Sequence, residues 1–314
     1  MDSSVQLITE ELYLSKKATD PLELAVLAGS MLILLGDENT IAPKLAAILS
    51  GRSSPVSGRV LIGEQQLDVM SHSARTLTAY VSADFSCPGG VTVSGYLELA
   101  AAAAGFSRKD SEETLSQLYS WCSLTDYTDI PVENLSADLR FFTGFAAACL
   151  PVPRVMILQG PFPVDLHPLL EDLCDSDCAV VASVPGLEYV PQSSQRIALC
   201  SKNSVAHIIR FQELADACSS LMRMKVLFFP ALPRSVMESL KGARDIMAVE
   251  GGYQFNHSNL SAAVTNLANL ARANSRQIAG LEIRSPSSEE LMDFFSEDED
   301  TGEVDLFCGE DLDI

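Results

Sequence analysis

The chain has 314 residues, of which 47% are hydrophobic, and a formal net charge of −21. Its length and apolar content suffice for one large and one small domain, each with its own core. The surplus of acidic side chains opposes binding to the phosphates of nucleic acids and to an anionic membrane surface. We therefore expect no nucleic-acid partner and no direct membrane insertion.

The eight cysteines are scattered, and no two of them have the CxxC spacing of a zinc site. Buried or idle thiols in a reducing compartment, without a metal, are the expected result. Residues 1–12 are acidic and lack the basic start and apolar core of a secretory signal. The uncharged stretch 24–36 is too short to span a bilayer, so a cytoplasmic chain is predicted.

An altered phosphate-loop pattern follows the apolar strand predicted at residues 31–35. Residues 36–51 read GDENTIAPKLAAILSG and open with Gly36. A working loop has the pattern GxxxxGK[ST], in which glycines expose backbone N–H groups, the lysine neutralises phosphate charge and the hydroxyl holds magnesium. The positions of the second glycine, the lysine and the hydroxyl hold Ile41, Ala42 and Pro43.

Neighbouring residues do not restore this chemistry. Lys44 comes two positions late, which turns it by roughly 200° on the helix predicted at 45–49. Ile41 is β-branched, so the positive φ of a glycine would strain it, and its side chain would fill space meant for phosphate. Taken alone, the segment favours a strand, loop and helix without a phosphate function. A remodelled phosphate loop is the alternative.

Strand and helix patterns alternate through the first two thirds of the chain. Strands are predicted at 56–62, 76–82, 154–158 and 179–183, with a late hairpin at 193–199 and 206–209. Helices are predicted at 93–105, 111–122 and 139–150. The alternation favours an α/β fold with a mainly parallel sheet.

A second, smaller domain is predicted after a break near residues 221–224. Its strands are expected at 225–229, 246–249, 253–256 and 277–283, and its helices at 235–240 and 260–273. This βαββαβ order fits a small ferredoxin-like α+β domain. The predicted divisions are residues 1–222, 223–295 and 296–314.

The last predicted division is an acidic tail. Residues 285–314 contain twelve acids and no Lys or Arg, so −12 of the net charge of −21 lies there. This composition predicts disorder over 296–314. Leu306 and Phe307 are candidates for docking into a partner groove, and a purely solvating tail is the alternative.

Several segments, taken in order, resemble the ATP-binding subunits of ABC transporters. Residues 29–63 (GSMLILLGDENTIAPKLAAILSGRSSPVSGRVLIG) are similar to the family's phosphate loop, first helix and next strand entry. Residues 134–161 (NLSADLRFFTGFAAACLPVPRVMILQGP) resemble its signature, the helix that follows and the Walker B strand. The small domain and residues 286–291 resemble the C-terminal extension of exporter-type and gliding-type members. The resemblance spans residues 5–295.

This resemblance implies a P-loop NTPase-like ABC ATPase domain with a helical insert, and it identifies further altered positions. The Walker B aspartate and the glutamate that orients water align with Gln159 and Gly160. The glutamine that senses the γ-phosphate aligns with Ala83, and the switch histidine with Val184.

The signature and the adenine-stacking residue are also implied by the resemblance. Ser136 matches the signature serine, whereas Asp138 stands at a glycine position, where its carboxylate would repel a partner's γ-phosphate. Tyr13 lies near the place of the adenine-stacking aromatic residue.

Phosphoryl transfer requires charge neutralisation, a metal and a positioned nucleophile. Because the residues that supply these are replaced, we expect a pseudo-ATPase that is not an enzyme, with no catalytic residue, cofactor or metal. The first functional hypothesis is a non-hydrolysing structural or regulatory platform in a membrane-associated transporter or motility complex.

By resemblance, the expected partners are a membrane permease subunit and an intact ABC ATPase or a second copy in a dimer. Docking is expected through residues 87–127, which would hold the chain at the cytoplasmic side of the inner membrane through its partners. Two alternatives are kept. One is a regulatory nucleotide-binding protein or weak ATPase with a rebuilt site, and the other is a scaffold module of another cytosolic assembly.

Overall fold

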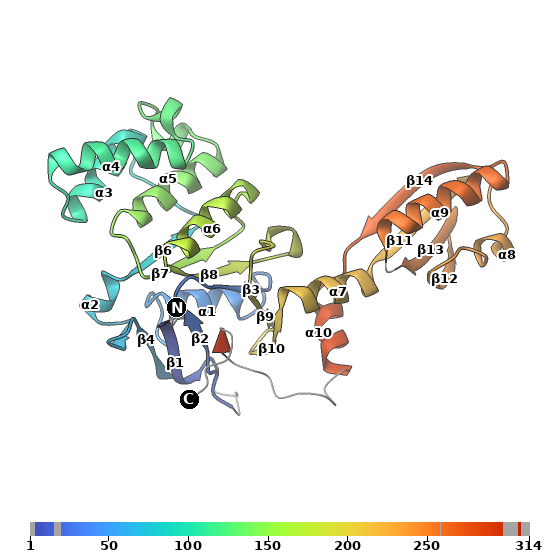
Figure 1. Cartoon of the computed structure of the whole chain (residues 1–314), viewed down its shortest axis with the longest axis horizontal. Helices are drawn as coiled ribbons and strands as arrows, with labels where there is room; N and C mark the ends of the chain where they lie inside the picture. Colours follow the sequence, from blue (N-terminus) through green and yellow to red (C-terminus); the bar gives the residue numbers. More distant parts are fainter. Residues whose placement is uncertain (1–3, 16–19, 258, 298–306, 309–314) are drawn as a thin grey trace. The chain divides into compact units, whose positions relative to one another are not determined.

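The computed structural model describes residues 4–15, 20–257, 259–297 and 307–308. The chain divides into two compact units (Figure 1). Unit 1 consists of Met1–Phe211 with Glu303–Ile314, and unit 2 of Gln212–Gly302.

A six-stranded sheet forms the centre of unit 1, within the described residues, in the order β10-β9-β3-β8-β7-β6. All neighbours in it are parallel except the hairpin of β9 and β10. Its strands are β3 (Met31–Leu35), β6 (Thr78–Ser82), β7 (Val155–Gln159), β8 (Ala179–Val184), β9 (Arg196–Cys200) and β10 (Val205–Arg210). The predicted mixed α/β fold with a mainly parallel sheet is confirmed.

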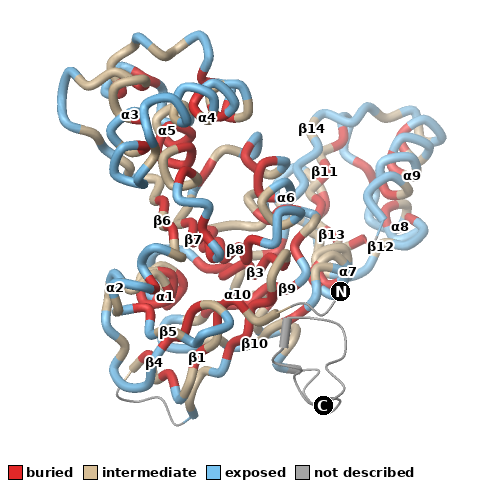
Figure 2. Tube along the Cα trace, turned by 60° about the vertical axis from the view of Figure 1, so that its left-hand side comes forward, coloured by how far each residue is buried: buried red, intermediate tan, exposed pale blue. Residues whose placement is uncertain are grey.

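The core of unit 1 lies on the two faces of this sheet. Every residue of β3 and β8 is buried, as expected of parallel strands that are covered on both faces. Figure 2 shows this burial along both strands and along helix α1 (Ala42–Leu49). Leu45 and Ile48 of α1 belong to the same buried cluster as Ile157 of β7.

A second, antiparallel sheet in unit 1 was not predicted. Its order is β15-β2-β1-β4-β5, and only the pairing of β15 with β2 is parallel. Its strands are β1 (Val5–Tyr13), β2 (Ala25–Leu27), β4 (Ser57–Ile62), β5 (Leu67–Asp68) and β15 (Phe307–Cys308). Apart from residues 296–297 and β15, the predicted tail lies outside the described residues.

Three longer helices stand between β6 and β7 in the chain: α3 (Val93–Ala103), α4 (Arg108–Trp121) and α5 (Ala137–Cys149). Each has a side-chain cap, in which the hydroxyl of Thr92, Ser107 or Ser136 accepts a backbone N–H from the first turn. Trp121 packs against the buried Phe145, with ring centroids 5.6 Å apart. The short α2 (His72–Arg75) precedes β6, and α6 (His167–Asp175) precedes β8.

Unit 2 contains a four-stranded antiparallel sheet in the order β12-β13-β11-β14. Its elements are α7 (Phe211–Leu221), β11 (Arg223–Phe229), α8 (Arg234–Met237), β12 (Ala243–Val249), β13 (Gly252–His257), α9 (Leu260–Ala273), β14 (Gln277–Arg284) and α10 (Ser288–Glu297). Met224, Val226 and Phe255 of the sheet pack against Leu267 of α9. Unit 2 begins at Gln212 because α7, which was not predicted, belongs to it.

Candidate functional site

Four predicted site positions meet at the carboxyl ends of neighbouring parallel strands. Gly36 follows β3, Ala83 follows β6, Gln159 ends β7 and Val184 ends β8. The Gly36 N–H donates to the Val184 carbonyl at 3.0 Å, and the Ala83 N–H to the Gln159 carbonyl at 2.8 Å. Open α/β sheets bind ligands at this edge, which is therefore the candidate nucleotide site.

The loop between β3 and α1 bonds largely to itself. The Asp37 carboxylate accepts the Asn39 N–H at 2.9 Å, and the Asp37 carbonyl accepts the Thr40 N–H at 3.1 Å. The Thr40 hydroxyl donates to that carbonyl at 2.7 Å and accepts the Ala42 N–H at 3.3 Å. A phosphate that used these N–H groups as donors would have to displace the bonds they already make.

Ile41 is held in the ordinary right-handed conformation, with φ −73°. The backbone strain considered for a positive φ therefore does not arise. Its side chain is buried, and its N–H donates to the Ser201 carbonyl at 2.8 Å. Helix α1 begins at Ala42, earlier than predicted, because Pro43 is well suited to a first turn that needs no N–H donor. Lys44 donates instead to the Leu14 carbonyl at 3.0 Å.

Gln159, at the predicted Walker B position, has a partner that the sequence analysis missed. The Tyr80 hydroxyl donates to Gln159 Oε1 at 2.5 Å, and the Arg52 guanidinium lies over the Tyr80 ring, 4.5 Å from its centroid. Tyr80 is opposite Ile157 in the β6–β7 register, two residues before Gln159. The alternation of side chains along these strands is the signal that could have placed Tyr80 and Gln159 on one face.

The remaining predicted positions lie on or beside other elements. Ser136 caps α5 by accepting the Leu139 N–H at 3.3 Å, and Asp138 is exposed in the first turn of that helix. Tyr13 ends β1, opposite Ser57 of β4. Gly160 follows β7, and its N–H donates to the Ser183 carbonyl at 2.8 Å. The structure thus brings the strand-end positions together, whereas Ser136, Asp138 and Tyr13 belong to other elements or their caps.

A cavity of about 900 Å³ lies beside the sheet edge. Tyr80 lines it from β6, and Asp84 lines it from the segment after that strand. Two arginines also line it: Arg52 follows α1, and Arg75 is the last residue of α2. Phe85 and Tyr96 also line it, with ring centroids 5.3 Å apart. Another wall consists of small residues on α3, just after α3, and on α5. These residues are Ala100, Ala103, Ala104, Gly144, Ala147 and Ala148.

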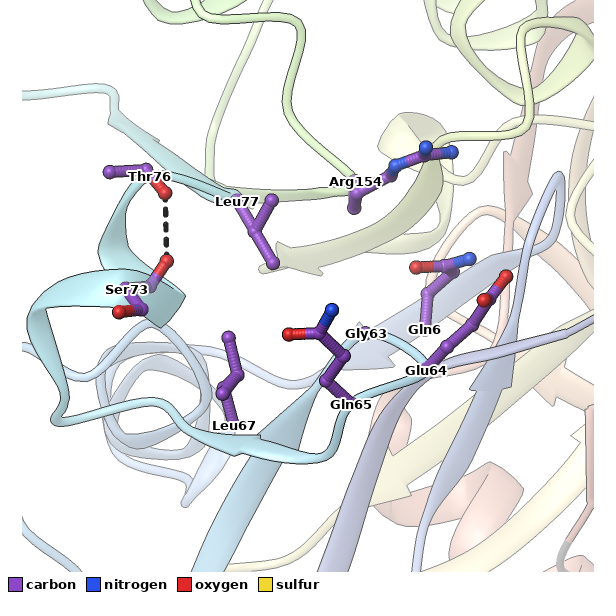
Figure 3. A pocket seen from close by; sticks show the side chains of 9 residues that line it. All are labelled: Gln6, Gly63, Glu64, Gln65, Leu67, Ser73, Thr76, Leu77 and Arg154. Atoms are coloured by element: carbon purple, nitrogen blue, oxygen red, sulfur yellow. Dashed lines mark hydrogen bonds between the residues drawn. The ribbon is translucent and has the colours of Figure 1, made fainter.

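A second pocket, of about 350 Å³, lies at the opposite ends of the strands (Figure 3). Leu77 and Arg154, which line it, precede β6 and β7, so this pocket faces the amino ends of the parallel strands. Its other polar lining residues are Gln6, Glu64, Gln65, Ser73 and Thr76. None of the predicted nucleotide-site residues lines it.

Burial makes several thiols unreactive. Desolvation raises the pKa of Cys122, Cys178 and Cys200 to about 12, so these thiols stay protonated near neutral pH. The seven cysteines whose side chains are described are all free. In the same part of the chain, no three His, Cys, Asp or Glu side chains are grouped to hold a metal ion. No helix among the described residues has the length and apolar character needed to cross a membrane.

Sequence comparison finds short, distant relatives, and no protein-family model matches the chain. A 136-residue segment is 26% identical to ATP-binding cassette sub-family A member 10 of Homo sapiens. A 153-residue segment is 27% identical to the cholesterol transporter ABCA5 of Rattus norvegicus. These segments cover 43% and 47% of this chain but only 9% of either relative.

Solved structures resemble the chain over a larger share. The structure of cbiO1 from Clostridium perfringens, part of the ABC transporter complex cbiONQ, matches with a TM-score of 0.58 and 17% identity, covering 67% of this chain and 90% of cbiO1. An ATP-binding subunit of an ABC transporter gives 0.59 and 17%, with coverage of 67% and 91%. A putative metal-chelate type ABC transporter in an inward-facing conformation gives 0.55 and 15%, with coverage of 80% and 96%.

These comparisons correct one prediction. The expectation that the chain is not an enzyme is contradicted, because its neighbours are ABC ATPase subunits and such subunits hydrolyse ATP. The resemblance to the ABC family is confirmed at the level of the fold. The chain has the fold of the ATP-binding subunit of an ABC transporter.

Proposed function

We propose that this chain is the ATP-binding-cassette component of a transporter or motility complex, where it serves as a structural or regulatory platform for a membrane permease subunit. It would work at the cytoplasmic side of the inner membrane through that partner, paired with a second copy or another ABC ATPase. The observation that carries the proposal is the cavity of about 900 Å³ beside the sheet edge.

The chemistry of this cavity suits an inserted helix. Small side chains on α3 and α5, such as Ala100 and Ala148, let a partner backbone approach closely. Phe85 and Tyr96 offer aromatic contact area, which is enriched at protein interfaces. The docking region predicted at 87–127 contributes Tyr96 and the alanines of α3 to this surface.

The other parts of the proposal rest on position. The eleven predicted nucleotide-site positions would mark the surface that faces a nucleotide or the second ABC subunit. Residues 223–295 would form the ferredoxin-like regulatory domain of the platform, which the βαββαβ order of β11 to β14 supports.

Capture of the membrane partner tests the platform. Tagged full-length chain is incubated with detergent-solubilised membranes of its native host, and bound proteins are identified by mass spectrometry. Ala100→Trp should abolish capture of a multispan membrane protein because the indole fills the cavity. Leu99→Trp is the matched control, since Leu99 lies on the same helix and is 66% exposed. Equal capture by the wild type and Ala100→Trp would refute docking in this cavity.

A weak ATPase or regulatory nucleotide-binding protein with a rebuilt site is the second candidate function. It is favoured by Gln159, whose amide is held at the sheet edge by Tyr80. The purified chain should then turn over Mg·ATP slowly, and Gln159→Ala should reduce the rate. A rate that is unchanged in Gln159→Ala would assign the turnover to a contaminant and reject this candidate.

A further inference from the structure

Three side chains in series connect the docking cavity with the sheet edge. The Arg52 guanidinium covers the Tyr80 ring, 4.5 Å from its centroid, and the Tyr80 hydroxyl donates to Gln159 Oε1 at 2.5 Å. Arg52 and Tyr80 both line the cavity, whereas Gln159 ends β7 among the predicted nucleotide-site positions. The series therefore has one end at each of the two surfaces.

The backbone places all three residues. Arg52 follows Gly51, which leaves α1 with φ +70°, and an added Cβ at Gly51 would meet the Val69 carbonyl oxygen at 2.8 Å. The Arg52 N–H then donates to the Ala47 carbonyl at 2.9 Å, which fixes the start of its side chain. Tyr80 and Gln159 lie on adjacent parallel strands and on the same face of the sheet. This geometry requires no ligand.

The two contacts influence each other through charge. A cation over an aromatic face draws on the electrons of the ring and strengthens the phenol hydroxyl as a donor. Because the Tyr80 hydroxyl bonds to Oε1 of Gln159, the Nε2 amide group of Gln159 is left to donate a hydrogen bond to another acceptor. Removing the Arg52 charge from the ring weakens the bond from Tyr80 and frees the amide to rotate.

We propose that Arg52, Tyr80 and Gln159 form a relay through which occupation of the cavity reorients the Gln159 amide at the sheet edge. Tyr80 is the positioning residue of this relay. The group that triggers it is a carboxylate on the docked partner helix, because a carboxylate pairs with a guanidinium more strongly than an aromatic ring does. This last part rests on the proposed docking function, while the internal connection does not.

The internal connection is tested in the full chain without a partner. NMR spectra of glutamine-labelled protein report the side-chain amide of Gln159, whose signal is assigned by its loss in Gln159→Glu. Arg52→Ala should shift this signal, although no hydrogen bond joins the described side chains of Arg52 and Gln159. Arg75→Ala is the matched control, since Arg75 lines the same cavity and is not the arginine that covers Tyr80.

Tyr80→Phe decides whether the effect passes through the hydroxyl. In that background, Arg52→Ala should produce no further shift of the Gln159 signal. An unshifted signal in Arg52→Ala, or an equal shift with and without the Tyr80 hydroxyl, overturns the relay. Arg52→Gln, which keeps most of the side-chain stem, repeats the test if Arg52→Ala disturbs folding.

The trigger is tested with the membrane partner captured above. Arg52→Glu should weaken capture by about tenfold or more, because it would place like charges together. Unchanged capture by Arg52→Glu would show that no carboxylate of the partner helix pairs with Arg52. If Ala100→Trp still captures the partner while the Gln159 shift is present, the proposed docking fails and the internal relay stands. If Ala100→Trp loses the partner but Arg52→Ala does not shift the Gln159 signal, the relay is rejected and the docking function stands.

Discussion

The loop between β3 and α1 and the cavity beside β6 lie in the same unit but are packed in opposite ways. In the loop, the N–H groups of Asn39, Thr40, Ile41 and Ala42 are all bonded within the protein. The cavity instead leaves about 900 Å³ open beside alanine side chains. A ligand of the loop must compete with existing backbone bonds, whereas a ligand of the cavity enters space that the side chains leave open.

This contrast separates what each surface requires of its partner. A nucleotide at the loop has to replace the Asp37 carboxylate and approach a buried isoleucine side chain. A helix in the cavity has only to match its shape and the charges of Arg52, Arg75 and Asp84. The relay through Tyr80 would let the open surface act on the closed one.

The largest effect is expected from closing the loop further. In Gly36→Ala, the new Cβ would collide with the side chain of Thr40 and lie 3.1 Å from Cys200 Cβ. Overpacking of this kind costs roughly 1–3 kcal/mol, which urea unfolding measures. Gly95→Ala on α3 is the control, because its Cβ would lie no nearer than 3.2 Å to another side chain, that of Thr92, and it should cost less stability than Gly36→Ala. Equal stability of the wild type and Gly36→Ala would show that the loop is not tightly packed.

Opening the loop should have the next largest effect. Asp37→Ala removes a negative charge and releases the Asn39 N–H, so Mg·ATP should bind about tenfold more tightly, a gain of about 1.4 kcal/mol. Calorimetry of the two proteins measures this ratio. Glu38→Ala removes the same charge from an exposed neighbour and is the matched control. An equal gain in both variants would mean that net charge alone, and not the bond to Asn39, limits binding.

Filling the cavity should barely affect the fold. Ala100→Trp extends into open space, so its free energy of unfolding should stay within about 0.5 kcal/mol of the wild type. Chemical denaturation of both proteins provides the measurement. A loss of several kcal/mol would show that α3 and α5 need this space empty to pack correctly.

The smallest effect concerns His167, beyond the end of β7. Its Nε2 is buried without a hydrogen-bond partner. Desolvation by burial lowers its pKa, so the unfolded chain binds a proton first as the pH falls below about 6.5. Stability should therefore decline from that pH down to the lower pKa of the folded state.

Thermal unfolding between pH 8 and pH 5 measures this decline, and His167→Gln should flatten it. His72→Gln, at an exposed position on α2, is the matched control. An identical pH dependence in His167→Gln and the wild type would exclude His167 as the cause.

Strong local patterns made much of the fold predictable. The continuous apolar runs that became β3 and β8 were expected as strands, and α9 has the predicted bounds Leu260–Ala273. The three-residue β2 was missed because so short a strand shows no recognisable alternation of apolar and polar residues. Helices α7 and α10 were missed because their apolar stripes lie beside turn and acidic residues.

The site was predictable only in part. The resemblance to ABC ATPases assigned Gly36, Ala83, Gln159 and Val184 to one nucleotide site, and the parallel β3, β6, β7 and β8 bring them to one edge of the sheet. The bonds of Asp37 to its own loop and of Tyr80 to Gln159 depend on side-chain conformations that sequence spacing does not determine. The prediction of no enzymatic activity rested on the identity of single side chains, and it is contradicted by the relatives of the whole fold.

The bond from the Ile41 N–H to the Ser201 carbonyl also affects how the protein is made. Its donor is synthesised early and its acceptor, just after β9, much later. A contact between such distant segments forms only after the intervening chain has been organised. During translation the loop thus lacks this hydrogen bond until β9 has left the ribosome. A ribosome stalled before Ser201 would carry a chain in which the loop before α1 is not bonded to the segment after β9.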